Sequence, residues 1–202
     1  MEKIEINKSS FEFLWYSCFR APYDSENKEL ICADRAYLDL CRTIKFRSKD
    51  ENIHKSFRYD VNKLIVGLIE DMLDQNTVVE NSDEWYEKAC NKIIEKAEET
   101  CKEFHFGQAQ KWLNMTIKYM LVMGLHEEKF NSIKPYLHVP VDNYIIKAAK
   151  DKGVKTPSAS WSQWDYTKYR KFQKDLRKKI NEPAIDWESS AWIKIANDKN
   201  KS

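Results

Sequence analysis

Apolar residues recur every three to four positions over most of this chain, which is the spacing of amphipathic helices. The clearest case is residues 53–73, where the apolar side chains keep to one helical face over about six turns. Ser9 or Ser10 is predicted to cap an earlier helix that ends near Phe19. The same spacing predicts further helices over residues 28–44, 83–104, 108–123, 165–180 and from 183 onward.

Residues 108–123 are apolar around nearly the whole helix, which predicts a central helix with neighbours on several sides. Only 4 Gly and 5 Pro occur in 202 residues, too few for a sheet-rich protein with many tight turns. We therefore expect an all-α fold. It is either one compact multi-helix domain over residues 1–202, or two closely packed helical lobes, about 1–80 and 81–202, with a cleft between them.

The nearly balanced charge of the chain limits the kinds of partner that it can bind. The formal net charge is only +2, so the chain as a whole is no polycationic nucleic-acid binder, and any phosphate contact must come from a local patch. Five cysteines without a C-x-x-C pair predict free thiols in a reducing cytoplasm, and no metal or cofactor site. No signal peptide is recognised at the start, and no run approaches the roughly 20 apolar residues of a membrane span.

Asp142 stands where an extended, proline-containing segment is predicted to turn into a helix. A carboxylate in this place accepts hydrogen bonds from backbone N–H groups of the first helical turn. That geometry suits a plain helix cap, and it equally suits a catalytic acid or base at the mouth of a cleft. Both interpretations of Asp142 remain open at this point.

The stretch Val139-Pro140-Val141-Asp142-Asn143-Tyr144-Ile145-Ile146 resembles the helix-hairpin-helix DNA glycosylases. In that family a similar Val-Asp sequence follows a central helix, and its aspartate opens a helix at the base-binding cleft. The resemblance implies that Asp142 activates water, or stabilises positive charge on the sugar, as an N-glycosidic bond breaks. It also implies DNA as the partner, with a base flipped out of the duplex and held between aromatic faces.

Three features of that family differ here. The family's hairpin carries Gly-x-Gly, whose backbone amides bind a DNA phosphate, whereas only Gly107 precedes the apolar helix of this chain. The lysine of the strand-cleaving members falls on Ala109, with Lys111 two residues away, and the four-cysteine iron–sulfur signature is absent.

Several other residues are candidates for contact with a substrate. His138 lies close to Asp142 in sequence, and Gln108 and Lys111 are polar positions at the start of the apolar helix. Three aromatic residues in or beside a loop could stack on a base or pin the loop onto the core, namely Trp161, Trp164 and Tyr166. Four lysines share one helical face and could bind phosphate or simply face solvent, namely Lys168, Lys171, Lys174 and Lys178.

These observations favour recognition of a DNA base or nucleotide, with hydrolysis of an N-glycosidic bond by Asp142 as the reaction if the protein is an enzyme. A non-catalytic module that binds a nucleotide or nucleic acid is the first alternative, because a fold does not by itself carry a function. A helical protein whose aromatic surface meets a protein partner or a second copy of itself is the other.

Overall fold

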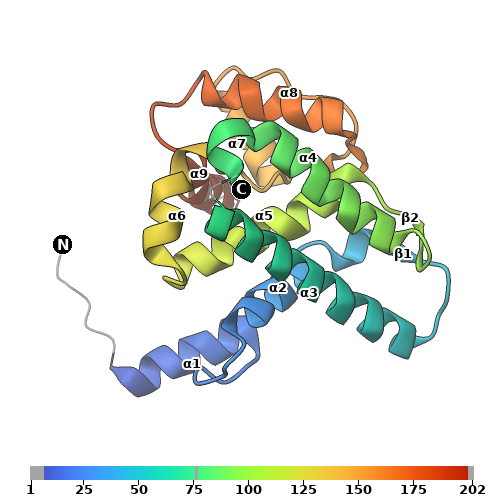
Figure 1. Ribbon diagram of the computed structural model, residues 1–202. Coiled ribbons are helices and arrows are strands. Elements are labelled where there is room, and N and C mark those ends of the chain that lie inside the picture. The colour runs from blue at the N-terminus through green and yellow to red at the C-terminus, as the bar shows by residue number, and fades with distance from the viewer. Residues whose placement is uncertain (1–6, 76, 200–202) are drawn as a thin grey trace.

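Helix α5 (Phe106–Val122) runs through the middle of the computed structural model, and the other helices pack around it (Figure 1). The structure describes residues 7–75 and 77–199. Most side chains of α5 are buried, as its apolar sequence predicts. Its largest contact surface is with α2 (Lys28–Leu38), and α4 (Thr77–Ala97) also packs closely against it.

The protein is all-α, as predicted. Three helices complete its first half with α2, namely α1 (Lys8–Phe19), α3 (Glu51–Gln75) and α4. Four more follow α5, namely α6 (Glu127–Ile133), α7 (Asn143–Asp151), α8 (Tyr166–Arg177) and α9 (Ala184–Lys199). Short 3₁₀ turns lie at Cys41–Thr43, Lys134–Tyr136 and Trp161–Gln163.

Two predicted helices end earlier than the sequence pattern indicates. The helix predicted over residues 28–44 ends at Leu38, and the one predicted over 83–104 ends at Ala97. After Leu38 the chain enters a 3₁₀ turn at Cys41–Thr43 and then strand β1 (Lys45–Phe46). After Ala97 it enters β2 (Cys101–Glu103), which pairs antiparallel with β1. The first helix also begins earlier than predicted, because Asn7 caps it and accepts a hydrogen bond from Ser10 N at 2.9 Å.

One contiguous hydrophobic core draws on both halves of the described chain, from Trp15 in α1 to Ile195 in α9. Some buried polar groups in it, such as Trp15 Nε1, have no hydrogen-bond partner in the part of the chain that the structure describes, while several others are hydrogen-bonded. For example, the Trp112 Nε1–H donates to Ala33 O and to Asn62 Oδ1, both at 3.1 Å. Among the described residues, no helix is long and apolar enough to cross a membrane.

Gly107 brings the loop before α8 onto the start of α5. A Cβ atom at this position would lie 1.9 Å from Trp161 O, so only glycine permits so close an approach of the two backbones. The Gly107 amide donates to Trp164 O at 2.9 Å. The one glycine of the predicted hairpin therefore serves helix–loop packing, and its N–H group already has a partner inside the fold.

Candidate active site

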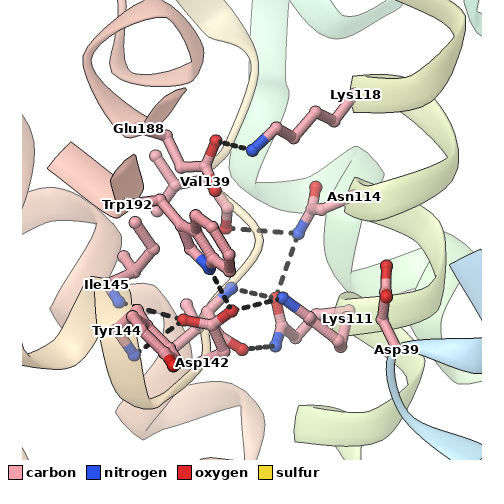
Figure 2. A network of polar contacts seen from close by, with 12 residues as sticks. Asp39, Lys111, Asn114, Lys118, Val139, Asp142, Tyr144, Ile145, Glu188 and Trp192 are labelled. Atoms are coloured by element: carbon pink, nitrogen blue, oxygen red, sulfur yellow. Dashed lines mark hydrogen bonds and ion pairs between the residues drawn. The ribbon is translucent and has the colours of Figure 1, made fainter. Parts of the chain in front are cut away.

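Asp142 caps helix α7, as the sequence predicts. Its backbone is extended, and its Oδ1 accepts hydrogen bonds from the amides of Tyr144 and Ile145, both at 2.9 Å (Figure 2). These two bonds fix the carboxylate at the positive end of the helix. One carboxylate oxygen is thereby used by the cap, and the other points away from it toward α5.

That second oxygen, Oδ2, meets Lys111. The Lys111 Nζ lies 2.7 Å from it, and the two side chains are only 5% and 15% exposed. The Nε1–H of Trp192, which comes from α9, donates to the same oxygen at 3.3 Å. The structure thus brings together an amine and a carboxylate that are 31 residues apart in sequence. An amine in hydrogen-bond contact with a carboxylate is an arrangement that suits a nucleophile and its general base.

A second ion pair lies beside the first. Lys118, two helical turns after Lys111, contacts Glu188 of α9, whose side chain is 1% exposed (Figure 2). Burial raises the pKa of Glu188, while the nearby ammonium groups of Lys118 and Lys111 act in the opposite direction. The facing sides of α5 and α9 therefore carry two lysines against a glutamate and a tryptophan.

An aromatic surface adjoins the Asp142 carboxylate. The rings of Tyr144 and Trp192 are stacked, with centroids 4.9 Å apart and an interplanar angle of 26°. Trp192 is 36% exposed, so part of its ring faces solvent. A planar ligand that reaches Asp142 would meet these rings.

Gln108 was predicted to contact a substrate, but its polar atoms bond within the fold. Its Oε1 accepts from His105 N at 2.8 Å, and its Nε2 donates to Thr43 O at 2.8 Å. Gln108 thus completes the cap at the start of α5 and joins this helix to the turn after α2. Lys111, one helical turn further on, reaches Asp142.

His138 was predicted to act near Asp142, and the structure places its ring in the core. The ring is stacked on Tyr86 with centroids 3.8 Å apart, its Nδ1 lies 2.7 Å from Tyr169 OH, and its Nε2 lies 3.5 Å from Asp83 Oδ1. Burial lowers the pKa of His138 to about 3. An imidazole buried against Tyr86 and Tyr169 does not suit the predicted contact with a substrate.

The two loop tryptophans are buried and anchor the loop, whereas Tyr166 begins helix α8. Trp161 and Trp164 are buried, and the Trp164 Nε1–H donates to Ala159 O at 3.0 Å. Tyr166 is partly exposed and its hydroxyl donates to Asp83 O at 3.2 Å. Of the two roles open for these rings, the burial of both tryptophans matches anchoring, because large apolar rings gain most by leaving water.

The predicted basic face lies on α8, and carboxylates accompany each of its lysines. Lys168 pairs with Asp165, and Lys171 and Lys178 pair with Asp175 at 2.6 and 3.6 Å. Lys174 lies 3.2 Å from Asp83, which Arg170 also contacts. All four lysine side chains stay partly exposed, and Lys171, Lys174 and Lys178 line a hollow of about 290 Å³ on this side of the helix. Phosphate binding here would compete with these surface pairs, which are individually weak.

Four side chains at the site were missed by sequence reasoning, namely Lys118, Tyr144, Glu188 and Trp192. The signals were present in the spacing, since Lys111 and Lys118 are seven residues apart and Glu188 and Trp192 are four apart. Each spacing places two side chains on one helical face. Only the structure shows that these faces of α5 and α9 meet.

Comparisons with known protein families, with curated proteins and with solved structures find no match to this chain. Within the described residues, no group of three or more His, Cys, Asp or Glu side chains is placed to hold a metal ion.

Proposed function

We propose that this protein cleaves the N-glycosidic bond of a base in nucleic acid, with Asp142 as the catalytic carboxylate and Lys111 as the amine that works with it. The observation that carries the proposal is the 2.7 Å contact between Lys111 Nζ and Asp142 Oδ2, with the other carboxylate oxygen held by two backbone amides. Such a site usually consists of a nucleophile, a general base within hydrogen-bond distance of it, and a third group that orients the general base.

The chemistry follows from these two groups. The Lys111 ammonium passes a proton to Asp142 and its amine attacks C1′ of the sugar. The bond from C1′ to the base breaks, its electron pair leaves with the base, and the base takes up the proton that Asp142 carries. The nitrogen now bonded to C1′ gives a proton to Asp142, which passes it to the ring oxygen as the sugar opens. An imine between Lys111 and C1′ results, which water hydrolyses. In the alternative route Asp142 accepts a proton from water, and the water attacks C1′ directly.

The surroundings of the pair support a planar, anionic substrate. The stacked rings of Tyr144 and Trp192 adjoin the carboxylate and offer a face to a base. The lysines of α8 would attract the phosphate backbone. The local resemblance of residues 139–146 to the helix-hairpin-helix glycosylases gives the same substrate class.

The test is base release from a panel of DNA duplexes that carry normal, oxidised, alkylated and deaminated bases, scored by mass. We expect the wild type to release one class of base, and Asp142→Asn to lose at least about 100-fold in rate. Borohydride reduction distinguishes the routes, since it traps an imine on Lys111 and leaves the water route without a covalent product. Lys111→Gln controls the trapping. Release of no base from any duplex would contradict the proposal.

A second candidate is a nucleic-acid binding module without chemistry. The exposed lysines around the α8 hollow favour it, because they need no catalytic pair to hold phosphate. Salt-dependent DNA binding that is equal in the wild type and Asp142→Asn, with no released base, would establish this alternative.

A further inference from the structure

The segment that leads to Asp142 is buried without a neighbouring strand. Residues 137–141 are all buried, and the structure assigns them to neither helix nor strand. Backbone N–H and C=O groups in such a place need hydrogen-bond partners, because an unpaired buried group costs about 1–3 kcal/mol. In a sheet the adjacent strand supplies them. Here side chains from three helices do so, one of them Tyr86 of α4, whose hydroxyl accepts from His138 N at 3.1 Å.

Two glutamines act on this segment in the same way. Gln110 of α5 accepts from Val141 N through Oε1 and donates to Val141 O through Nε2, both at 3.1 Å. Gln173 of α8 does the same for Val139, with distances of 3.2 Å to the amide and 2.8 Å to the carbonyl. Each carboxamide thus reproduces the pair of bonds that a neighbouring strand would make. Both glutamine side chains are fully buried.

Further bonds fix the orientation of the Gln110 carboxamide. Its Nε2 also donates to Gly107 O at 2.9 Å, and its Oε1 also accepts from Asn114 Nδ2 at 3.1 Å. A reversed carboxamide would place its oxygen against two carbonyls and its amino group against two donors. The Asn114 amide in turn donates to Tyr169 OH at 3.0 Å. Asn114 therefore links Gln110 to a buried residue of α8.

Gln110 and Lys111 are consecutive residues of α5. The two residues that they contact, Val141 and Asp142, are also consecutive in the sequence. Gln110 holds the backbone of Val141, and Lys111 meets the carboxylate of Asp142, with the same separation of 31 residues in both cases. A shift of Val141 relative to α5 would therefore move the Asp142 carboxylate relative to the Lys111 amine. Displacements of about 1 Å at a reacting pair are enough to slow a reaction about 100-fold.

We propose that Gln110 is a positioning residue that sets the Asp142 carboxylate against the Lys111 amine, while Gln173 serves the fold of the same segment two residues earlier. This inference rests on the proposed function for its effect on rate. It also has a consequence for the Lys111 amine that does not depend on any reaction.

The experiment compares Gln110→Met with Gln173→Met, since methionine is close to glutamine in shape and removes the pair of bonds to the buried segment at both sites. Gln110→Met also removes the bonds to Gly107 and Asn114. Base release at saturating and limiting duplex separates kcat from KM. We expect Gln110→Met to lower kcat about tenfold or more with little change in KM. We expect Gln173→Met to lower kcat less than about threefold. Equal losses in the two variants, or a loss in KM alone, would overturn the proposal.

Labelling of lysine amines by acetic anhydride, followed by peptide mass analysis, gives the second readout. In the wild type the contact with Asp142 and burial slow the labelling of Lys111. We expect Gln110→Met to raise its labelling rate several-fold relative to that of exposed lysines, and Gln173→Met to leave it near the wild-type value. Unchanged labelling of Lys111 in Gln110→Met would overturn the proposal.

Two outcomes are kept apart by this design. If the wild type releases no base, the proposed function fails, and the labelling of Lys111 still decides whether Gln110 positions the pair. If Gln110→Met does not fold, Gln110→Asn replaces it, because asparagine is neutral and keeps the carboxamide but is one methylene too short to hold Val141 in the same way. The same split of kcat and labelling is expected from that variant.

Discussion

The two oxygens of the Asp142 carboxylate have different partners, and the sequence predicts the partners of only one of them. The cap was predictable, because an aspartate after a proline-containing segment and before a helix is a strong local signal. The partner of the second oxygen was not, because Lys111 lies 31 residues away and nothing local points from one residue to the other. Sequence reasoning chose both residues without joining them.

His138 was predicted to act near Asp142, and its side chain lies elsewhere. Its place beside Asp142 in sequence suggested shared chemistry, yet the extended backbone between them turns the imidazole toward Tyr86 and Tyr169. Strand alternation does not account for this direction, because residues four positions apart in an extended segment point to the same side. The direction of the first side chain depends on the packing of α4 and α8, which no local pattern records.

The buried imidazole of His138 makes a prediction about stability and pH. Its pKa is about 3 in the folded protein and about 6.5 in the unfolded chain. Below pH 6.5 the unfolded chain therefore binds a proton that the folded protein does not, and stability falls as the pH falls toward 3. The expected slope approaches about 1.4 kcal/mol per pH unit for this one group.

Urea unfolding at several pH values between 6.5 and 4.5 measures that slope. The His138→Gln variant is the control, because it keeps a polar side chain and removes the titrating group. We expect the free energy of unfolding to depend less steeply on pH in His138→Gln than in the wild type. Equal slopes would show that His138 takes up its proton in the folded state as well.

At the scale of elements, the helical periodicity predicted most of the described helices, and tertiary contacts decided where they end. Residues 53–73 and 108–123 appear as α3 and α5, within about two residues at each end. The short pair β1–β2 was missed, because it joins residues more than 50 positions apart and each strand has only two or three residues. Such pairing leaves no repeat for a pattern to detect.

Two glycines give a matched test of the packing between elements. Gly107→Ala would place a Cβ against the backbone of Trp161, and we expect a loss of about 2–4 kcal/mol in the free energy of unfolding. Gly67→Ala lies inside α3 with no heavy atom within 4 Å of the added Cβ, and we expect a gain of about 0.5–1 kcal/mol.

Chemical denaturation of the two variants beside the wild type measures both changes. We expect Gly107→Ala to lower the free energy of unfolding and Gly67→Ala to raise it. A Gly107→Ala protein as stable as the wild type would mean that the loop at Trp161 can move away from α5 without cost.

At the scale of the whole molecule, the candidate site draws on three helices and the segment before one of them. Lys111 and Lys118 come from α5, Glu188 and Trp192 from α9, and Asp142 from the start of α7 (Figure 2). No single stretch of sequence contains enough of these residues to form a motif. The resemblance around residues 139–146 was found because that part alone is continuous in sequence.

The charge of α8 carries a prediction about nucleic-acid binding. If its lysines hold phosphate, the double variant Lys171→Glu/Lys178→Glu should weaken duplex binding and reduce the slope of log K against log salt by about 0.9 for each lost contact. Lys8→Glu in α1 is the control, because α1 and α8 lie at opposite ends of the molecule in Figure 1. Fluorescence anisotropy at several salt concentrations measures both.

Loss of binding in the double variant alone would support an interface on α8. Equal binding in all three proteins would mean that these lysines, each of which already has a carboxylate partner, only face solvent.

The most direct test of the account is the single-turnover rate of base release by the wild type, Asp142→Asn and Asp165→Asn on the duplex that the wild type cleaves best. Asp165 caps α8 as Asp142 caps α7, so its variant controls for the loss of a capping charge alone. We predict that Asp142→Asn is at least about 100-fold slower and that Asp165→Asn keeps the wild-type rate. Equal rates in Asp142→Asn and the wild type would contradict a catalytic role for Asp142.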